Sequence, residues 1–188
     1  MELAEVLKRR RSIRLYTGEP IATSVIDDLI DAATSAPSPL NSQPWHFHVA
    51  LGTARKAVGE AVAQSTRFLE EYASILPAGQ LEKAAEFYAD LGNAPVVIGV
   101  SVPDSEDDVE RTNRLVAAGA AIENLMLRAT DLGFGACCIT APRWVIDEVK
   151  AALCVADDRV LAGLVLVGVP AEEPIPTERR RDAVTYLE

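Results

Sequence analysis

Residues 8–14 read Lys-Arg-Arg-Arg-Ser-Ile-Arg, and residues 36–45 read Ala-Pro-Ser-Pro-Leu-Asn-Ser-Gln-Pro-Trp. The chain is otherwise acidic, with a formal net charge of −10. Like charges crowded into residues 8–14 repel one another, and a bound dianion such as a phosphate monoester would offset that repulsion. The C-terminal end of a short helix over residues 2–10 would also favour cations, so part of this charge needs no ligand.

The second stretch belongs to a stiff polar loop, residues 35–44. Its three prolines disfavour helix. Ser38, Asn41, Ser42 and Gln43 supply many hydrogen-bond donors and acceptors. A stiff polar loop together with an anion-binding segment indicates a site for a phosphorylated planar cofactor.

Length and composition indicate a single soluble domain over residues 1–188. A pI near 4.7 argues against a nucleic-acid-binding protein. The N-terminus lacks the apolar run of a signal peptide, and the longest apolar run, residues 160–170, is about half a membrane span. Three cysteines do not suggest a disulfide framework, so we expect a cytoplasmic protein without membrane contact.

Helices and strands are expected to be interspersed without βαβ repetition, which favours the α+β class. Thr23 or Ser24 is expected to cap the second helix, and Pro142 to begin the last one. The helix over residues 111–132 is apolar nearly all round, so a subunit interface is one way to bury it. The expected helices are 2–10, 24–35, a broken helical stretch over 53–91, 111–132 and 142–154; the expected strands are 46–51, 96–102, 136–140 and 160–169.

The motifs Arg-Arg-Ser-x-Arg and Ala-Pro-Ser-x-x-Asn-x-Gln-Pro-Trp resemble those of the flavin-dependent nitroreductase family. The likeness covers residues 1–50, 115–142 and 160–170. It implies a mixed, largely antiparallel sheet flanked by helices, in an intertwined homodimer with two FMN sites at the interface. The tail, residues 170–188, would then be able to pack on the partner subunit.

The resemblance also assigns residues to the cofactor phosphate. Arg10, Arg11, Ser12 and Arg14 would bind it, because the planar guanidinium can grip phosphate oxygens bidentately. Family members often add a late basic residue, for which the tail offers Arg179 and Arg181. An exposed tail with no such role is the alternative.

The flavin ring would be contacted by three further sets of residues. Pro37, Ser38 and Asn41 would cover it from the partner subunit, unless the loop is only a connector anchored by Trp45. The backbone N–H groups of Thr140 and Ala141 would serve the reactive N5 atom. An additional contact would come from Gln64 or Ser65, between which the sequence does not decide.

The implied function is FMN-dependent hydride transfer from NADH or NADPH, through N5, to a small-molecule acceptor by a ping-pong mechanism. The acceptor would be a nitroaromatic, a quinone or a similar electrophile. Because the flavin carries the chemistry, no side chain is assigned as a catalytic acid, base or nucleophile. Alternatives are dehalogenation, azoline oxidation or flavin breakdown on the same fold, a flavin-binding protein without turnover, and an acidic scaffold.

Two other clusters are given structural interpretations. His46 and His48 share one strand face, but no Cys or carboxylate accompanies them, so no metal site is expected. Cys137 and Cys138 could form a strained disulfide, although two small buried apolar residues explain them more simply.

Overall fold

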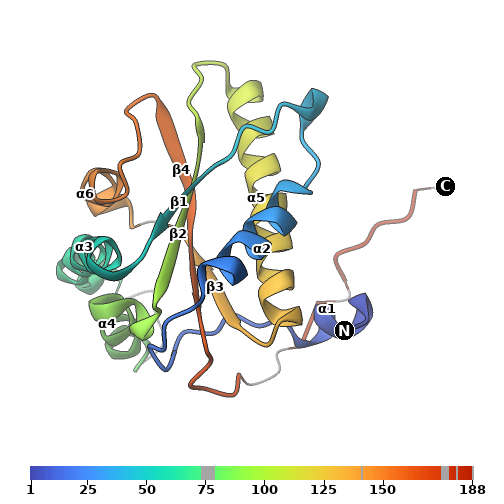
Figure 1. Cartoon of the computed structure of the whole chain (residues 1–188). Helices are drawn as coiled ribbons and strands as arrows, with labels where there is room; N and C mark the ends of the chain where they lie inside the picture. The colour runs from blue at the N-terminus through green and yellow to red at the C-terminus, as the bar shows by residue number, and fades with distance from the viewer. Residues whose placement is uncertain (73–78, 141, 175–177, 181, 188) are drawn as a thin grey trace.

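Four antiparallel strands form one sheet in the order β1-β2-β4-β3 (Figure 1). The computed structural model describes residues 1–72, 79–140, 142–174, 178–180 and 182–187. The strands are β1 (His46–Ala50), β2 (Val96–Pro103), β3 (Gly135–Ile139) and β4 (Arg159–Gly168). The apolar runs of β2 and β4 take the two central positions, as expected for strands covered on both faces. The four expected strands and the α+β class are confirmed.

Helices cover both faces of this sheet (Figure 1). Successive residues of β2 point to opposite sides, so Ile98 joins the core beneath one helical layer and Val97 joins the core beneath the other. One layer holds α2 (Thr23–Thr34) and α5 (Asp108–Asp131); the other holds α3 (Gly52–Ala63), α4 (Gln80–Asp90) and α6 (Ile146–Ala152). The remaining elements are α1 (Leu3–Arg9) and the 3₁₀ turns η1 (Pro39–Asn41), η2 (Gln64–Tyr72), η3 (Leu91–Asn93) and η4 (Arg143–Val145).

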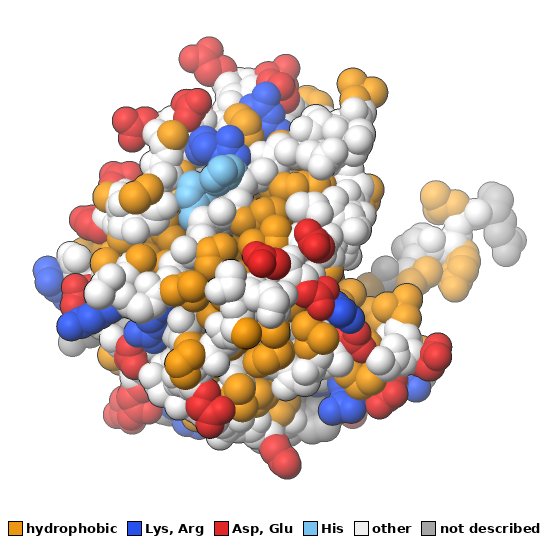
Figure 2. All heavy atoms as spheres, in the orientation of Figure 1, with side chains coloured by type: hydrophobic (Ala, Val, Ile, Leu, Met, Phe, Trp, Pro, Cys, Tyr) orange, Lys and Arg blue, Asp and Glu red, His pale blue; other side chains and the backbone are white. Residues whose placement is uncertain are grey.

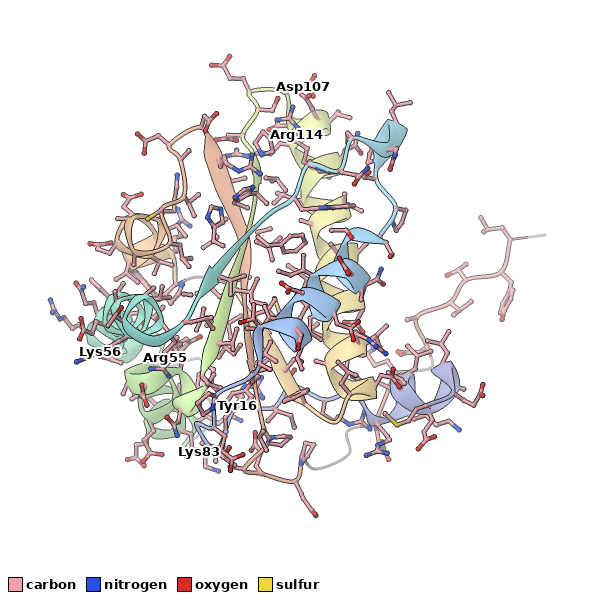
Figure 3. The ribbon with its side chains drawn as sticks, viewed as in Figure 1. Tyr16, Arg55, Lys56, Lys83, Asp107 and Arg114 are labelled. Atoms are coloured by element: carbon pink, nitrogen blue, oxygen red, sulfur yellow. The ribbon has the colours of Figure 1, made fainter. Side chains whose placement is uncertain are left out.

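Helix α5 is the longest element, and both of its ends are capped. The Asp107 carboxylate accepts hydrogen bonds from the backbone N–H groups of Val109 (2.8 Å) and Glu110 (3.0 Å), and Figure 3 shows Asp107 at this end. Gly133, at φ 85°, ends the helix as expected, and Phe134 N donates back to Ala129 O. The Asp107 cap explains why the helix begins three residues before the expected Arg111.

One face of α5 is buried, but the helix is not covered all round. Val116 on the opposite side is 67% exposed, and Val109 is 70% exposed. Among the helices of the described residues, none is both long and apolar enough to cross a membrane.

Two expectations about helix N-termini are wrong: the residue that caps α2 and the residue that begins α6. Helix α2 begins after Ala22, and neither Thr23 nor Ser24 caps it, because both lie inside the first turn. Pro142 precedes η4 as its N-cap, so the regular helix α6 starts only at Ile146.

Gly92 holds the N-terminal segment in place and leaves no room for a side chain. Its φ is 62°, and a Cβ atom there would lie 1.7 Å from the carbonyl oxygen of Arg14. Its own carbonyl accepts a hydrogen bond from Tyr16 N at 2.9 Å. The position of Arg14 therefore depends on a glycine some eighty residues away in the chain.

We predict that Gly92→Ala lowers the free energy of unfolding by about 4 kcal/mol or more, since the clash is with backbone and cannot relax by rotation. Gly133→Ala is the matched control, because Gly133 also has positive φ but has nothing within 4 Å of a built Cβ. The control should lose only about 1–2 kcal/mol. Urea unfolding of both variants tests this, and equal losses would contradict it.

Candidate cofactor site

Residues 12–17 form a segment that is anchored in the core at two points. Ile13 and Tyr16 are buried, and Figure 3 shows Tyr16 near the end of the sheet. Ile13 N donates to Ala136 O of β3 at 3.1 Å, and Tyr16 N donates to Gly92 O. The side chain of Arg14, which lies between these two anchors, is left on the surface.

The predicted phosphate-binding residues share one groove of about 510 Å³, here called the arginine groove. Four guanidinium groups and two carboxylates line it, which leaves a surplus of two positive charges. Glu123, which lies outside this lining, pairs with Arg10 and reduces the surplus, but the groove remains cationic and suits an anion. The lining residues are Arg10, Arg11, Ser12, Arg14, Glu172, Glu173, Pro174 and Arg179.

The arginines of the groove differ in their partners. Arg10 Nε lies 2.9 Å from Glu123 Oε1 of α5. Arg11 Nη1 donates to the carbonyls of Lys8 and Arg10, each at 2.7 Å, so this side chain ties down the end of α1. Arg11 Nε is buried and finds no acceptor among the described residues. Arg11 therefore shapes the groove as well as contributing charge to it.

The chain after β4 runs beside the arginine segment and closes one side of the groove. Thr17 N donates to Val169 O at 3.0 Å, and Ala171 N donates to Leu15 O at 2.9 Å. The Glu172 carboxylate accepts from the backbone N–H groups of Arg14 and Leu15. Sequence reasoning missed Glu172, because no motif marks a carboxylate that binds backbone N–H groups so far away in the chain.

The late basic residues have different positions. Arg179 lines the groove. Arg180 is exposed and forms an ion pair with Asp182 at 3.0 Å. Arg181 lies outside the described residues, so its predicted role stays a prediction.

The polar loop, residues 35–44, lies elsewhere. It shares a cavity with Glu110 and Asn113, near the start of α5. Glu123, the partner of Arg10, is ten residues further along, about 15 Å by the helical rise. Figure 1 shows η1 and α1 at opposite ends of α5. Pro37, Ser38 and Asn41 are therefore not brought to the arginine groove of the same chain.

The loop has a defined but strained backbone. Leu40, Asn41 and Gln43 have φ values of 51°, 54° and 44°, in the left-handed region. That region costs about 1–2 kcal/mol for a non-glycine residue. Ser38 Oγ accepts a hydrogen bond from Gln43 N at 3.0 Å and closes the loop on itself. Leu40 at the tip is completely exposed.

Strand β3 connects the groove with the predicted N5 contacts. Ala136 is bridged to Ser12, and Thr140 follows the strand four residues later, about 14 Å away. Thr140 is exposed; Ala141 lies outside the described residues. Cys137 and Cys138 are free thiols, and burial raises the pKa of Cys138 to about 11, so it stays uncharged.

The structure separates the two candidates for an additional ring contact. Ser65 is 1% exposed, and its hydroxyl has no hydrogen-bond partner among the described residues. Gln64 is only partly buried, at the C-cap of α3. The Ser65 hydroxyl is therefore free to bind a further group, and the choice between Gln64 and Ser65 as a ring contact stays a prediction.

Fold and groove together define an α+β protein with a cation-lined site beside an edge strand. The Nitroreductase family model matches residues 7–169, so the chain belongs to the nitroreductase family. A Bacillus subtilis protein provisionally named an NAD(P)H nitroreductase, YfhC, is 27% identical over 98% of this chain and 94% of its own length. A nitrobenzene nitroreductase of Ectopseudomonas oleovorans is 25% identical over 86% of this chain and 84% of its own.

Solved structures agree with the fold. The FMN and NADPH-dependent nitroreductase NfnB of sphigopyxis sp. strain HMH superposes with a TM-score of 0.80 at 21% identity, over 100% of both chains. A Bacteroides fragilis nitroreductase with bound FMN gives 0.76 at 25% identity, also over 100% of both chains. The nitroreductase-like fold expected from the sequence motifs is confirmed.

Proposed function

We propose that this chain binds FMN with its phosphate in the arginine groove. The gathering of four arginines in that groove, which stays net positive beside its carboxylates, carries the proposal. Arg10, Ser12 and Arg14 would hold the phosphate with Arg179, through charge-assisted hydrogen bonds. The buried Arg11 Nε, which has no acceptor among the described residues, supports a site that is incomplete without a ligand. The FMN named for NfnB and for the Bacteroides fragilis protein supports this choice.

When bound, FMN would supply hydride transfer, and the protein would supply binding and orientation. The backbone N–H groups of Thr140 and Ala141 would face the ring beyond β3. The partly buried thiol of Cys138, uncharged at neutral pH, would add no negative charge beside it. The hydrogen bond from Tyr16 N to Gly92 O fixes the main chain beside Arg14, so Arg14 would keep a constant position relative to the flavin ring.

The functional unit we propose is a homodimer in which each polar loop completes the partner's site. Pro37, Ser38 and Asn41 do not line the groove of their own chain, and Leu40 at the tip of the loop is completely exposed. A second copy would also cover Val116 on α5. The tail exposes Val184, Tyr186 and Leu187, apolar side chains that would pack on the partner. Residues 1–188 would form one domain of this dimer, in the cytoplasm.

The proposed reaction is electron transfer from NADH or NADPH to a small electrophile such as a nitroaromatic or a quinone. The names NAD(P)H nitroreductase and nitrobenzene nitroreductase among its relatives favour this reaction over dehalogenation, azoline oxidation or flavin breakdown. A flavin-binding protein without turnover would have the same groove and is separated from the enzyme by experiment.

We predict that protein loaded with FMN loses its yellow absorbance when NADPH or NADH is added without oxygen. Adding nitrobenzene should then restore the absorbance. Bleached protein that neither nitrobenzene nor a quinone reoxidises would indicate a different flavin reaction. Yellow protein that neither nicotinamide bleaches would contradict an NAD(P)H oxidoreductase.

Arg10→Ala combined with Arg14→Ala should weaken FMN binding by about a hundredfold or more, because two charge-assisted contacts to the dianion are lost. Lys8→Ala with Arg9→Ala is the control, since these neighbouring cations do not line the groove. Flavin fluorescence titration gives both affinities, and circular dichroism checks the fold. Wild-type affinity in the first variant would place the phosphate elsewhere.

A further inference from the structure

Arg159, the first residue of β4, binds three neutral oxygens. Its Nε donates to Ser101 Oγ at 2.8 Å, and its Nη2 donates to the carbonyls of Ser101 and Pro44, each at 2.9 Å. Among the described residues it forms no ion pair, and burial lowers the pKa of its guanidinium. The neighbouring Asp158 carboxylate offsets part of this lowering of the pKa but forms no ion pair with Arg159. A partly buried cation whose hydrogen bonds all go to neutral oxygens is costly unless those bonds hold a needed structure.

Ser101 extends this network to β1. Its side chain is fully buried, and its Oγ lies 2.9 Å from His48 Nε2. Because the hydroxyl accepts from Arg159, its proton is available to His48, which then accepts as a neutral imidazole. Burial, followed by the nearby His46 and Arg159, lowers the pKa of His48 and keeps it neutral. Figure 2 shows the two histidines side by side at the surface.

The third partner, Pro44, is the last residue of the polar loop. Trp45, the next residue, is buried in the core at 9% exposure, so the loop joins the sheet at this point. The loop carries three left-handed residues, and its internal hydrogen bonds are Ser38–Gln43, Gln43–Asn41 and the backbone bonds Asn41 N to Ser38 O and Ser42 N to Pro39 O, all of which lie within residues 38–43 and do not tie the loop to the sheet. A strained backbone persists only where its surroundings fix it. The bond from Arg159 to the Pro44 carbonyl is such a restraint.

We infer that Arg159 is a positioning residue that holds the polar loop in the shape required to cover the cofactor in the partner subunit. It touches no cofactor itself, and it acts through the Pro44 carbonyl, with Ser101 and His48 fixing its guanidinium. The inference rests on the proposed function, because it requires that the loop of one chain contacts the FMN bound by the other chain.

Arg159→Met should weaken FMN binding about tenfold or more, because the loop would leave its bound shape. The matched control is Arg55→Met. Arg55 is another partly buried arginine that binds backbone, the carbonyls of Asp90 and Ala94, but it sits on α3 away from the loop (Figure 3). Arg55 also forms an ion pair with Asp90, and its partners flank the Gly92 turn beneath Arg14, so Arg55→Met should lose stability and some affinity without any effect on the loop. Arg159→Met should lose stability and clearly more affinity.

Two readouts separate positioning from general destabilisation. Affinity is measured by flavin fluorescence at a temperature where circular dichroism shows both variants folded. Amide hydrogen exchange without FMN should show Gln43 N–H exchanging about tenfold faster or more in Arg159→Met than in Arg55→Met. Arg159→Lys, which keeps the charge but loses the planar fork, should recover part of the affinity.

Equal FMN affinity in Arg159→Met and Arg55→Met would overturn the inference, as would unchanged exchange at Gln43. Should Arg159→Met fail to fold, Arg159→Lys takes its place, with an expected loss of several-fold in affinity; wild-type affinity in that variant would then overturn the inference. Wild-type protein that binds no FMN would defeat the proposed function first, so the two failures are distinguishable.

Discussion

The repulsion among the N-terminal arginines is the constraint on which the account depends. In an otherwise acidic chain, cationic side chains lie together at one groove. Residues distant in the sequence bind the backbone beneath them. Gly92, β3 and Glu172 each bind this segment through its main chain, so the side chain of Arg14 is not needed to anchor it, whereas that of Arg11 ties down the end of α1. The cationic side chains of such a segment can bind an anionic ligand while its main chain stays fixed in the fold.

The second constraint is the separation of loop and groove along α5. The helix is too long for residues near its start to meet residues bound to Glu123. In the proposed dimer, one cofactor would contact the groove of one chain and the polar loop of the other. Such sharing would also bury Leu40 and Val116, which a single chain leaves in water.

The sequence predicts much of this arrangement, because most of the signals are local. Alternating or continuous apolar runs locate the four strands, and Gly133 marks the end of α5. The arginines of residues 8–14 are close in sequence, so their shared groove needs little tertiary information. The Asp107 cap is also a local signal, but the sequence analysis expects this helix to begin only at Arg111.

Other features could not be predicted, because they depend on residues that meet only in the fold. Glu172 reaches the backbone of Arg14 from the far end of the chain. Arg159 reaches Pro44 across two strands, and no periodicity in the sequence signals that contact. The left-handed conformation of Leu40 is likewise unexpected, since leucine has no preference for it.

The central claim is that one FMN is held by the arginines of one chain and the polar loop of the other. Its most direct test mixes a subunit carrying Arg10→Ala and Arg14→Ala with a subunit carrying Ser38→Ala and Asn41→Ala, each with its own affinity tag. Neither homodimer should retain FMN, whereas the purified heterodimer should bind about one FMN, because one of its two symmetric sites is then intact. A heterodimer as empty as both homodimers would show that each site lies within a single chain and would contradict the account.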